Sequence, residues 1–293
     1  NLVVTVAVDG STVAPQVTTQ PSSQTWCAGE IATFNSGASG GPAPTVQWQV
    51  NTGGTWNNIG GATSSTLSFT TTTADNNKQY RAVWTNIAGS VNSNAATLTV
   101  NSIPSAPSVS ATNNCGSSLL TATGAGGATF SWSNGGTGNS ITVGAGDYTV
   151  TQTVNGCTSG SSAIATAVPK TNPGAPGVSV QNNCGSSLLT AAGDAGATFT
   201  WSIGAPANPI TVTSAGNYTV TQTVNGCTGP SNSATAAPKP VPALTSSLTS
   251  AATSSAVFSY TPSSNTSGTT FAWSRAAVSG ISNAADNGTG NIS

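Results

Sequence analysis

The chain has 293 residues and a formal net charge of −1, from five Lys and Arg and six Asp and Glu, and it contains no His. Charged residues make up 4% of the chain, against ~25% in an average protein, so neither a basic footprint for nucleic acid nor a polybasic membrane contact is expected. No run of 18 apolar residues occurs, so no membrane span is expected in this fragment. β-branched and aromatic residues alternate with polar ones, which indicates a folded rather than a disordered chain.

Residues 1–14 begin with the apolar run LVVTVAV, which is typical of a strand but has no partner of its own. We interpret it as the last strand of a preceding β domain. The chain starts at Asn1 without Met or a leader-like apolar region, so we expect a mature or internal fragment.

Residues 15–101 are predicted to form the first complete domain. Short β runs alternate here with turns, and the predicted strands are Ile31–Phe34, Val46–Val50, Thr66–Phe69, Gln79–Thr85 and Ala95–Val100. Since side chains alternate across a strand, Trp48 faces inward with its apolar neighbours, and Tyr80, Ala82 and Trp84 share one face.

These residues resemble a bacterial immunoglobulin-like domain. The resemblance implies that Trp48 is the core tryptophan of the third strand and that Tyr80 forms the tyrosine corner. The segments WCAGEIATF, TWNNI, YRAVWTNIAGS and AATLTV are similar to a version common in large surface proteins of Bacteroidetes. The usual second cysteine is replaced by Ala82, so Cys27 lacks a partner inside the domain. We expect Cys27 to be a free thiol, with an intermolecular bridge as the alternative.

Residues 102–170 and 171–239 are two copies of one sequence, NNCGSSLLTA to TVTQTVNGCT, offset by 69 or 70 positions. We predict two small β-sandwiches joined to their neighbours by short Pro-rich linkers, since proline favours stiff, extended segments. In the first copy the predicted strands are Ser108–Ala111, Leu119–Thr123, Thr129–Ser133, Ser140–Val143, Tyr148–Val154 and Thr158–Ala167. The inward aromatic residues expected in the two copies are Trp132, Tyr148, Trp201 and Tyr218.

Four of the five cysteines occupy matched positions in the two copies, which indicates one disulfide bond per copy and an oxidising compartment. With six antiparallel strands, the first and last turns lie at the same end of each sandwich. The sequence therefore predicts the bonds Cys115–Cys157 and Cys184–Cys227. A seventh strand would put the paired cysteines at opposite ends.

Residues 240–293 repeat the aromatic-x-Trp pattern in FAWSR, with Trp273 as the expected core residue. The tail SRAAVSGISNAADNGTGNIS resembles the start of a PKD-like domain of Bacteroidetes surface proteins. The predicted fold class is therefore all-β: a tandem array of small immunoglobulin-like and PKD-like sandwiches, of which the last is incomplete.

No catalytic constellation is visible in the sequence. A Ser or Cys nucleophile lacks a His base, and the six acids are too scattered for a glycosidase pair, so we expect no enzymatic activity and no cofactor. Metal binding is not expected, because the cysteines are assigned to disulfide bonds and Asp75 and Asp286 each stand alone in turn-like segments. Whether calcium binds near either Asp stays open.

Two tryptophans are candidates for ligand contact. Sugar binding uses exposed aromatics beside Asn, Gln or Asp, and Trp26 and Trp56 are the residues that fit. Trp56 also matches a recurrent position in the family, where it would pack against the sheet edge.

We favour a non-catalytic stalk of a large extracellular bacterial adhesin, acting as a semi-rigid spacer at the cell surface. The resemblance implies type IX secretion and kinship with gliding-motility adhesins. The alternatives are a carbohydrate-binding region of a secreted polysaccharide-degrading enzyme and a subunit of a self-assembling fibre. The expected partners are accordingly surface polysaccharides, other surface components or copies of the chain itself.

Overall fold

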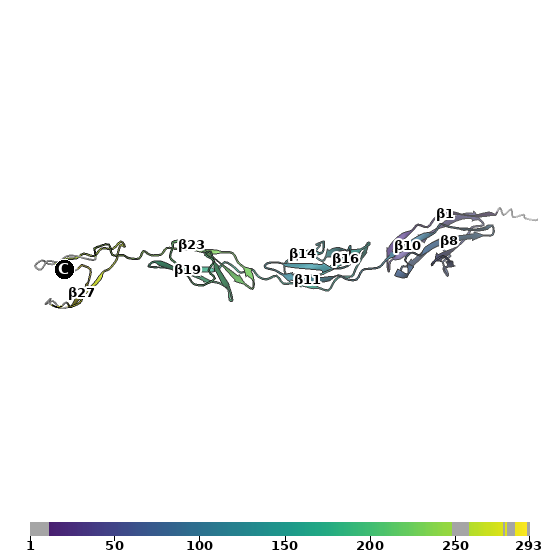
Figure 1. The fold of residues 1–293 in the computed structure, drawn as a ribbon. Coiled ribbons are helices and arrows are strands. Elements are labelled where there is room, and N and C mark those ends of the chain that lie inside the picture. Colours follow the sequence, from purple (N-terminus) through teal and green to yellow (C-terminus); the bar gives the residue numbers. More distant parts are fainter. Residues whose placement is uncertain (1–11, 248–257, 278, 280–284, 292–293) are drawn as a thin grey trace, which may run out of the picture. The chain divides into compact units, whose positions relative to one another are not determined.

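The structure, a computed structural model, describes residues 12–247, 258–277, 279 and 285–291. Its regular elements in these ranges are strands apart from a single 3-10 turn, η1 (Thr73–Asp75), which confirms the predicted all-β class. The chain divides into two compact units, Asn1–Pro169 and Lys170–Ser293. Figure 1 shows the strands of both units, coloured in sequence order. Most of the run expected to end a preceding domain (residues 1–14) lies outside the described residues.

The first sandwich contains ten strands. One sheet has the order β2-β10-β8-β5-β6 with β9 beside β8, and it faces the pairs β3–β7 and β1–β4. The bounds are β1 (Val13–Thr19), β2 (Gln24–Cys27), β3 (Ile31–Asn35), β4 (Gly37–Gly41), β5 (Thr45–Asn51), β6 (Trp56–Asn58), β7 (Thr66–Thr70), β8 (Gln79–Asn86), β9 (Gly89–Asn92) and β10 (Ala96–Asn101).

Alternating side chains of these strands form one core. Trp48 is fully buried and its indole Nε1 donates to the carbonyl oxygen of Ser64 at 2.8 Å. Tyr80 lies under Phe34, with ring centroids 4.9 Å apart, and Trp84 Nε1 donates to Ser36 Oγ at 3.0 Å. Both buried indoles therefore have hydrogen-bond acceptors, as buried tryptophans require.

The second sandwich has the two-sheet arrangement of immunoglobulin-like domains, β11-β12-β14 against β13-β16-β17, with β15 paired to β18. The third repeats it with β19-β20-β22 against β21-β23-β24 and with β25 on β23. Their bounds are β11 (Ser108–Asn113), β12 (Ser118–Thr123), β13 (Thr129–Trp132), β14 (Ser140–Val143), β15 (Gly146–Tyr148), β16 (Val150–Val154), β17 (Cys157–Thr158), β18 (Ala165–Ala167), β19 (Gly177–Asn183), β20 (Ser186–Ala192), β21 (Thr198–Trp201), β22 (Ile210–Val212), β23 (Gly216–Val224), β24 (Cys227–Thr228) and β25 (Asn232–Ala236).

Each small sandwich has its own core around a tryptophan, Trp132 in the second and Trp201 in the third, exposed by 3% and 1%. Tyr148 and Tyr218 are only half-buried beside these cores. Trp132 Nε1 donates to the carbonyl oxygen of Gly138 at 3.0 Å. The loop after Trp201 has a different sequence, and the buried Trp201 Nε1 finds no acceptor among the described residues.

A buried glutamine ties each small sandwich to the linker that precedes it. Gln152 is 1% exposed; its Oε1 accepts from Ala125 N at 2.8 Å, and its Nε2 donates to the linker carbonyl of Ser105 at 2.7 Å. Gln222 makes the same two contacts, with Asp194 N and with the carbonyl of Gly174. The segment before the first strand is therefore part of each folded module.

In the C-terminal segment, β26 (Ala272–Arg275) pairs antiparallel with β27 (Asp286–Thr289), so Arg275 lies opposite Asp286. Trp273 is half-buried, and a Cβ at Gly288 would lie 2.6 Å from its ring. Gly288 is therefore needed for the indole to cover the partner strand.

We expect Gln152→Ala to destabilise the second sandwich by about 2–4 kcal/mol, because it removes two hydrogen bonds of a buried side chain and leaves the space of that side chain empty. Hydrogen exchange followed by mass spectrometry would show reduced protection in peptides of β13 and β16. Gln222→Ala is the matched control, since it should produce the same loss in β21 and β23 instead. Unchanged protection in both variants would contradict the assigned role.

Candidate functional site

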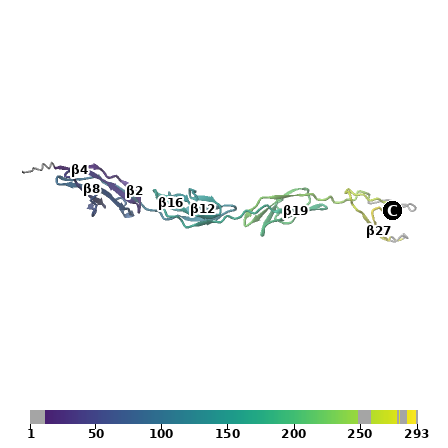
Figure 2. The same cartoon turned by 180° about the vertical axis from the view of Figure 1, so that it is seen from behind.

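The first and second sandwiches are joined by a disulfide bond between Cys27 and Cys157. The two sulfur atoms are 1.99 Å apart, the Cα atoms are 5.6 Å apart, and the cysteines are separated by 130 positions in the sequence. Cys27 is the last residue of β2, and Cys157 follows the hairpin turn Asn155–Gly156, where both residues have positive φ. Figure 2 labels β2 and also β16, the strand that leads into this turn. The bond therefore links a strand end of one module to the last hairpin of the next.

Further contacts surround this bond at the joint. β2 runs parallel to β10, with Cys27 opposite Asn101, and Ala28 N donates to the carbonyl oxygen of Asn101 at 2.9 Å. The Asn101 side chain in turn donates to the carbonyl oxygen of Asn155 at 3.0 Å. Thus Asn101, from which the chain leaves the first sandwich, contacts both sides of the joint.

The predicted disulfide pairing is wrong. Cys157 bonds to Cys27 and not to Cys115, so Cys27 is not a free thiol either. Cys184 is an exposed free thiol and therefore is not bonded to Cys227. Cys115 and Cys227 each lie in a disulfide bond.

A short return segment between β13 and β14 explains the error. After Trp132 the chain turns, with Gly135 N donating to the carbonyl oxygen of Trp132, and Thr137 then pairs antiparallel with Ser131. This segment acts as a seventh strand, so β14 runs in the same direction as β13. The return segment adds one reversal of chain direction between the first and the last turn. These two turns therefore lie at opposite ends of the module.

The position of Cys115 agrees with this topology. Asn113, two residues before it, accepts from Ser118 Oγ at 2.6 Å and from the backbone N of Val168 at 3.1 Å, at the end where the chain leaves the sandwich. Cys157 lies at the other end, where the chain enters. Each copy thus carries one cysteine at the end where the chain enters and one at the end where the chain leaves.

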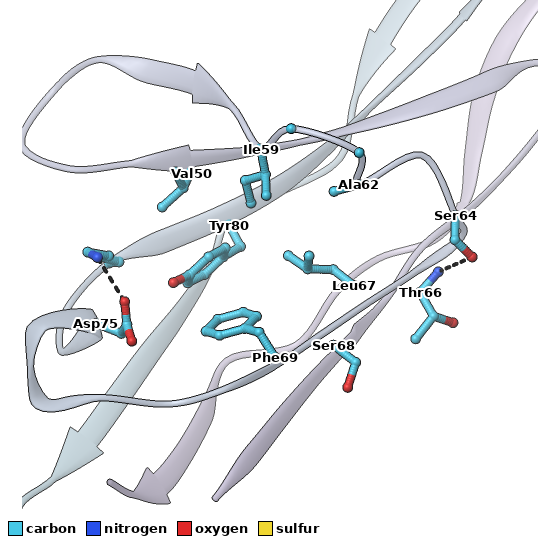
Figure 3. A pocket seen from close by; sticks show the side chains of 13 residues that line it. Val50, Ile59, Ala62, Ser64, Thr66, Leu67, Ser68, Phe69, Asp75 and Tyr80 are labelled. Carbon is cyan, nitrogen blue, oxygen red and sulfur yellow. Dashed lines mark hydrogen bonds and ion pairs between the residues drawn. The ribbon is translucent and has the colours of Figure 1, made fainter. Parts of the chain in front are cut away.

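The first sandwich also has an open pocket of about 490 Å³, lined by residues of β5, β7 and β8 and of the loop before β7. Figure 3 shows the rings of Phe69 and Tyr80 next to each other in its wall, with centroids 5.2 Å apart, and Asp75 at one edge. Burial raises the pKa of Tyr80 to about 12, with a smaller contribution from the charge of Asp75. The tyrosine hydroxyl therefore stays protonated at neutral pH and cannot serve as a base.

Both carboxylate oxygens of Asp75 are occupied by neighbouring groups. Oδ1 pairs with Lys78 Nζ at 2.8 Å, and Oδ2 accepts from the backbone N and the hydroxyl of Thr72 at 2.8 and 2.7 Å. Burial alone raises the pKa of Asp75, but the hydrogen bonds from Lys78 and Thr72 outweigh it, and the pKa lies below its ordinary value. These contacts hold the turn before β8 in place.

The two candidate ligand-facing tryptophans differ in their surroundings. Trp26 is 36% exposed on β2, and its Nε1 donates to Gln24 Oε1 at 2.7 Å. Trp56 is half-buried, and the guanidinium carbon of Arg81 lies 4.2 Å from its ring centroid.

Amide side chains continue the surface around Trp56. Arg81 Nε donates to Gln49 Oε1 at 2.8 Å, and Gln49 Nε2 donates to Asn58 Oδ1 at 2.9 Å. We call Gln49, Trp56, Asn58 and Arg81 the Trp56–Arg81 face. Sequence reasoning identified Trp56 alone, because the other three residues join it only through the register of β5, β6 and β8.

Among the residues that the structure describes, no group of three His, Cys, Asp or Glu could hold a metal ion. Within the same residues, no helix is long and apolar enough to cross a membrane.

The described sandwiches define the class of the protein: tandem immunoglobulin-like domains. A family described as a domain of unknown function (DUF8696) matches residues 16–102. Endoglucanase C of Cellulomonas fimi is 51% identical over 87 residues, which are 30% of this chain and 8% of that enzyme. The chain thus spans a small part of the curated relative it matches.

Solved structures with similar chains include two immunoglobulin arrays. The I-band fragment I67–I69 from titin is 15% identical, with a TM-score of 0.42, over 77% of this chain and 99% of that one. The immunoglobulin domains 1–5 of Sidekick-1 are 16% identical, with a TM-score of 0.28, over 80% and 61%.

We expect Asp75→Asn to lower the free energy of unfolding of the first sandwich by about 1–2 kcal/mol at pH 7, through loss of the contacts to Lys78 and Thr72. Because the folded-state pKa of Asp75 is below its unfolded value, its contribution is present above about pH 4 and is lost as the pH falls through the folded-state pKa. The difference between the variant and the native protein should therefore shrink toward pH 3. Hydrogen exchange of β7 and β8 at several pH values measures this difference in stability. A difference that does not change with pH would contradict the stabilising role assigned to the Asp75 carboxylate. Asp194→Asn, in the third sandwich, is the control.

Proposed function

We propose that this region is a non-catalytic spacer of a larger secreted bacterial protein, in which the disulfide bond across the joint between the first and second sandwiches limits bending between them. The observation that carries the proposal is the Cys27–Cys157 bond. A bond inside a module would stabilise that module alone, whereas this one fixes the end of one sandwich against the next.

The chemistry of the chain supports a structural role. The surface is built from Ser, Thr, Asn, Gln and Gly rather than charged residues, so salt has little to screen. Disulfide bonds persist in oxidising compartments, which favours a location outside the cytoplasm.

Two kinds of parent protein fit this role. In the first, the spacer extends an adhesive tip from the bacterial surface, and type IX export, gliding and filament formation rest on the sequence resemblance alone. In the second, it separates the domains of a secreted polysaccharide-degrading enzyme, which the 51% identity to a segment of Endoglucanase C favours.

The spacer proposal predicts that breaking the joint increases the motion between the first two sandwiches. Spin labels on ketone-bearing amino acids at positions 87 and 164, whose Ile side chains are 79% and 68% exposed, report the distance between the modules. In the double variant Cys27→Ser/Cys157→Ser we expect the distance distribution to widen about twofold, because only the short linker and weak contacts remain.

The same variant should destabilise the second sandwich by about 3–5 kcal/mol, since the lost bond closes a long loop. Cys184→Ser, which removes a free thiol, is the control and should change neither measurement. Equal distance distributions in the double variant and the control would reject the spacer mechanism.

A second candidate function is glucan binding by the Trp56–Arg81 face. Sugar rings stack on aromatic side chains while amides bind their hydroxyl groups, and this face provides both, with the Arg81 guanidinium lying over one side of the Trp56 ring. The similarity to a segment of an endoglucanase supports this chemistry.

Affinity electrophoresis of the full chain in gels containing soluble glucans tests this candidate. We expect retardation that Trp56→Ala weakens by about tenfold, the loss of about 1.4 kcal/mol of stacking. The variant Trp26→Ala tests the other candidate tryptophan in the same way. The variant Ile87→Ala, at an exposed apolar residue, is the control. Migration unaffected by any glucan would eliminate sugar binding while leaving the spacer proposal intact.

A further inference from the structure

Cys184 in the third sandwich has the backbone surroundings of Cys27. Cys184 forms a parallel bridge with Lys239, at the point where the chain leaves the sandwich, and Gly185 N donates to the carbonyl oxygen of Lys239 at 2.8 Å. Cys27 lies opposite Asn101 in a parallel pair, and Ala28 N donates to the carbonyl oxygen of Asn101 at 2.9 Å. In both sandwiches a cysteine thus lies beside the segment by which the chain leaves the sandwich. The backbone N–H of the next residue donates a hydrogen bond to that segment.

The two cysteines differ in whether they form a disulfide bond. Cys27 is half-buried and bonded to Cys157, whereas Cys184 is exposed and free. The outgoing chain is held close in the third sandwich as well, because a Cβ at Gly185 would lie 2.9 Å from a methyl group of Val241. The docking geometry is therefore formed around Cys184 before any bond is made.

The chemistry of the first joint defines what would fill this position. There the Asn101 side chain contacts the Asn155–Gly156 hairpin turn, and the cysteine after that turn bonds Cys27. In the unit Lys170–Ser293, the residue that leads into the third sandwich lies beside the equivalent hairpin: Lys170 Nζ is 4.0 Å from a Cβ position at Gly226. An incoming chain beside an Asn-Gly-Cys hairpin is thus a recurrent arrangement.

The other four cysteines of the chain are all in disulfide bonds, so none of them is available to Cys184. In the first joint the hairpin cysteine follows Asn101 by 56 residues. At the same interval after Lys239 the corresponding cysteine would lie in the module that follows the third sandwich.

We propose that Cys184 is a docking thiol for the hairpin cysteine of the β-sandwich module that follows the third sandwich in the same polypeptide. Bond formation converts two thiols into one disulfide with loss of two protons and two electrons. A disulfide of the oxidising compartment accepts the electrons by thiol–disulfide exchange and is released as two thiols. The inference concerns the partner of Cys184 and stands whether or not the joints limit bending.

The proposal is tested by inserting a second copy of residues 102–170 between Lys239 and Pro240 of the full chain. The insert supplies a hairpin cysteine at the interval of the first joint, and refolding in a glutathione redox buffer supplies the oxidant. Alkylation, digestion without reduction and mass spectrometry then identify each cysteine's partner. We expect the Cys184 peptide to be linked to the inserted Cys157 peptide, and the reactive thiol to move from Cys184 to the inserted Cys115.

The matched control carries Cys157→Ser in the insert alone, and there Cys184 should stay fully alkylated. Formation of the native Cys27–Cys157 bond in each protein verifies folding. The proposal is overturned if Cys184 stays alkylated in the folded insertion protein, or if it bonds the inserted Cys115. Cys184–Cys184 dimers in both the insertion protein and its control would also overturn it, because they would identify a second copy as the partner.

Discussion

A disulfide bond between successive sandwiches constrains a protein differently from one inside a sandwich. Modules of about 65 residues bury too little apolar surface to be robust alone. The Cys27–Cys157 bond ties the hairpin of the second sandwich to a strand end of the larger first one, and Asn101 adds a hydrogen bond across the same joint. Opening the hairpin therefore requires disturbing the neighbour, so the stability of one module depends on the module before it.

Under the proposed functions, the mechanical role and the recognition role would lie at different places in the first sandwich. Covalent connections lie at the ends of the sandwiches, whereas the Trp56–Arg81 face lies on the outer side of β5, β6 and β8. The open pocket beside Tyr80 is lined partly by core residues and is bordered by an ion pair that fixes a turn. If this face binds glucan as proposed, a substitution there would change binding without loosening the joint.

The sequence predicted the strands and the buried tryptophans well, because period-2 alternation and aromatic residues report directly on a sandwich core. Short strands such as β4, with the sequence GASGG, lack that pattern and were missed. The disulfide pairing failed for a related reason: the return segment through Thr137 is too short and Gly-rich to show as a strand, yet it reverses the strand parity. The burial of Gln152 was also invisible, since a glutamine among threonines is typical of an exposed strand.

The contacts of Gln152 and Gln222 have an evolutionary consequence. Each glutamine bonds a carbonyl group that precedes the first strand of its module, at Ser105 or Gly174, and Asn113 and Asn182 hold the segment that follows the last strand. If only the strands were duplicated, the side-chain amides of these Gln and Asn residues would lose their hydrogen-bond partners in the flanking segments. The heritable block is thus the sandwich with both flanking segments and both cysteines. A gene can lengthen by whole blocks, each arriving with the means to join its neighbours.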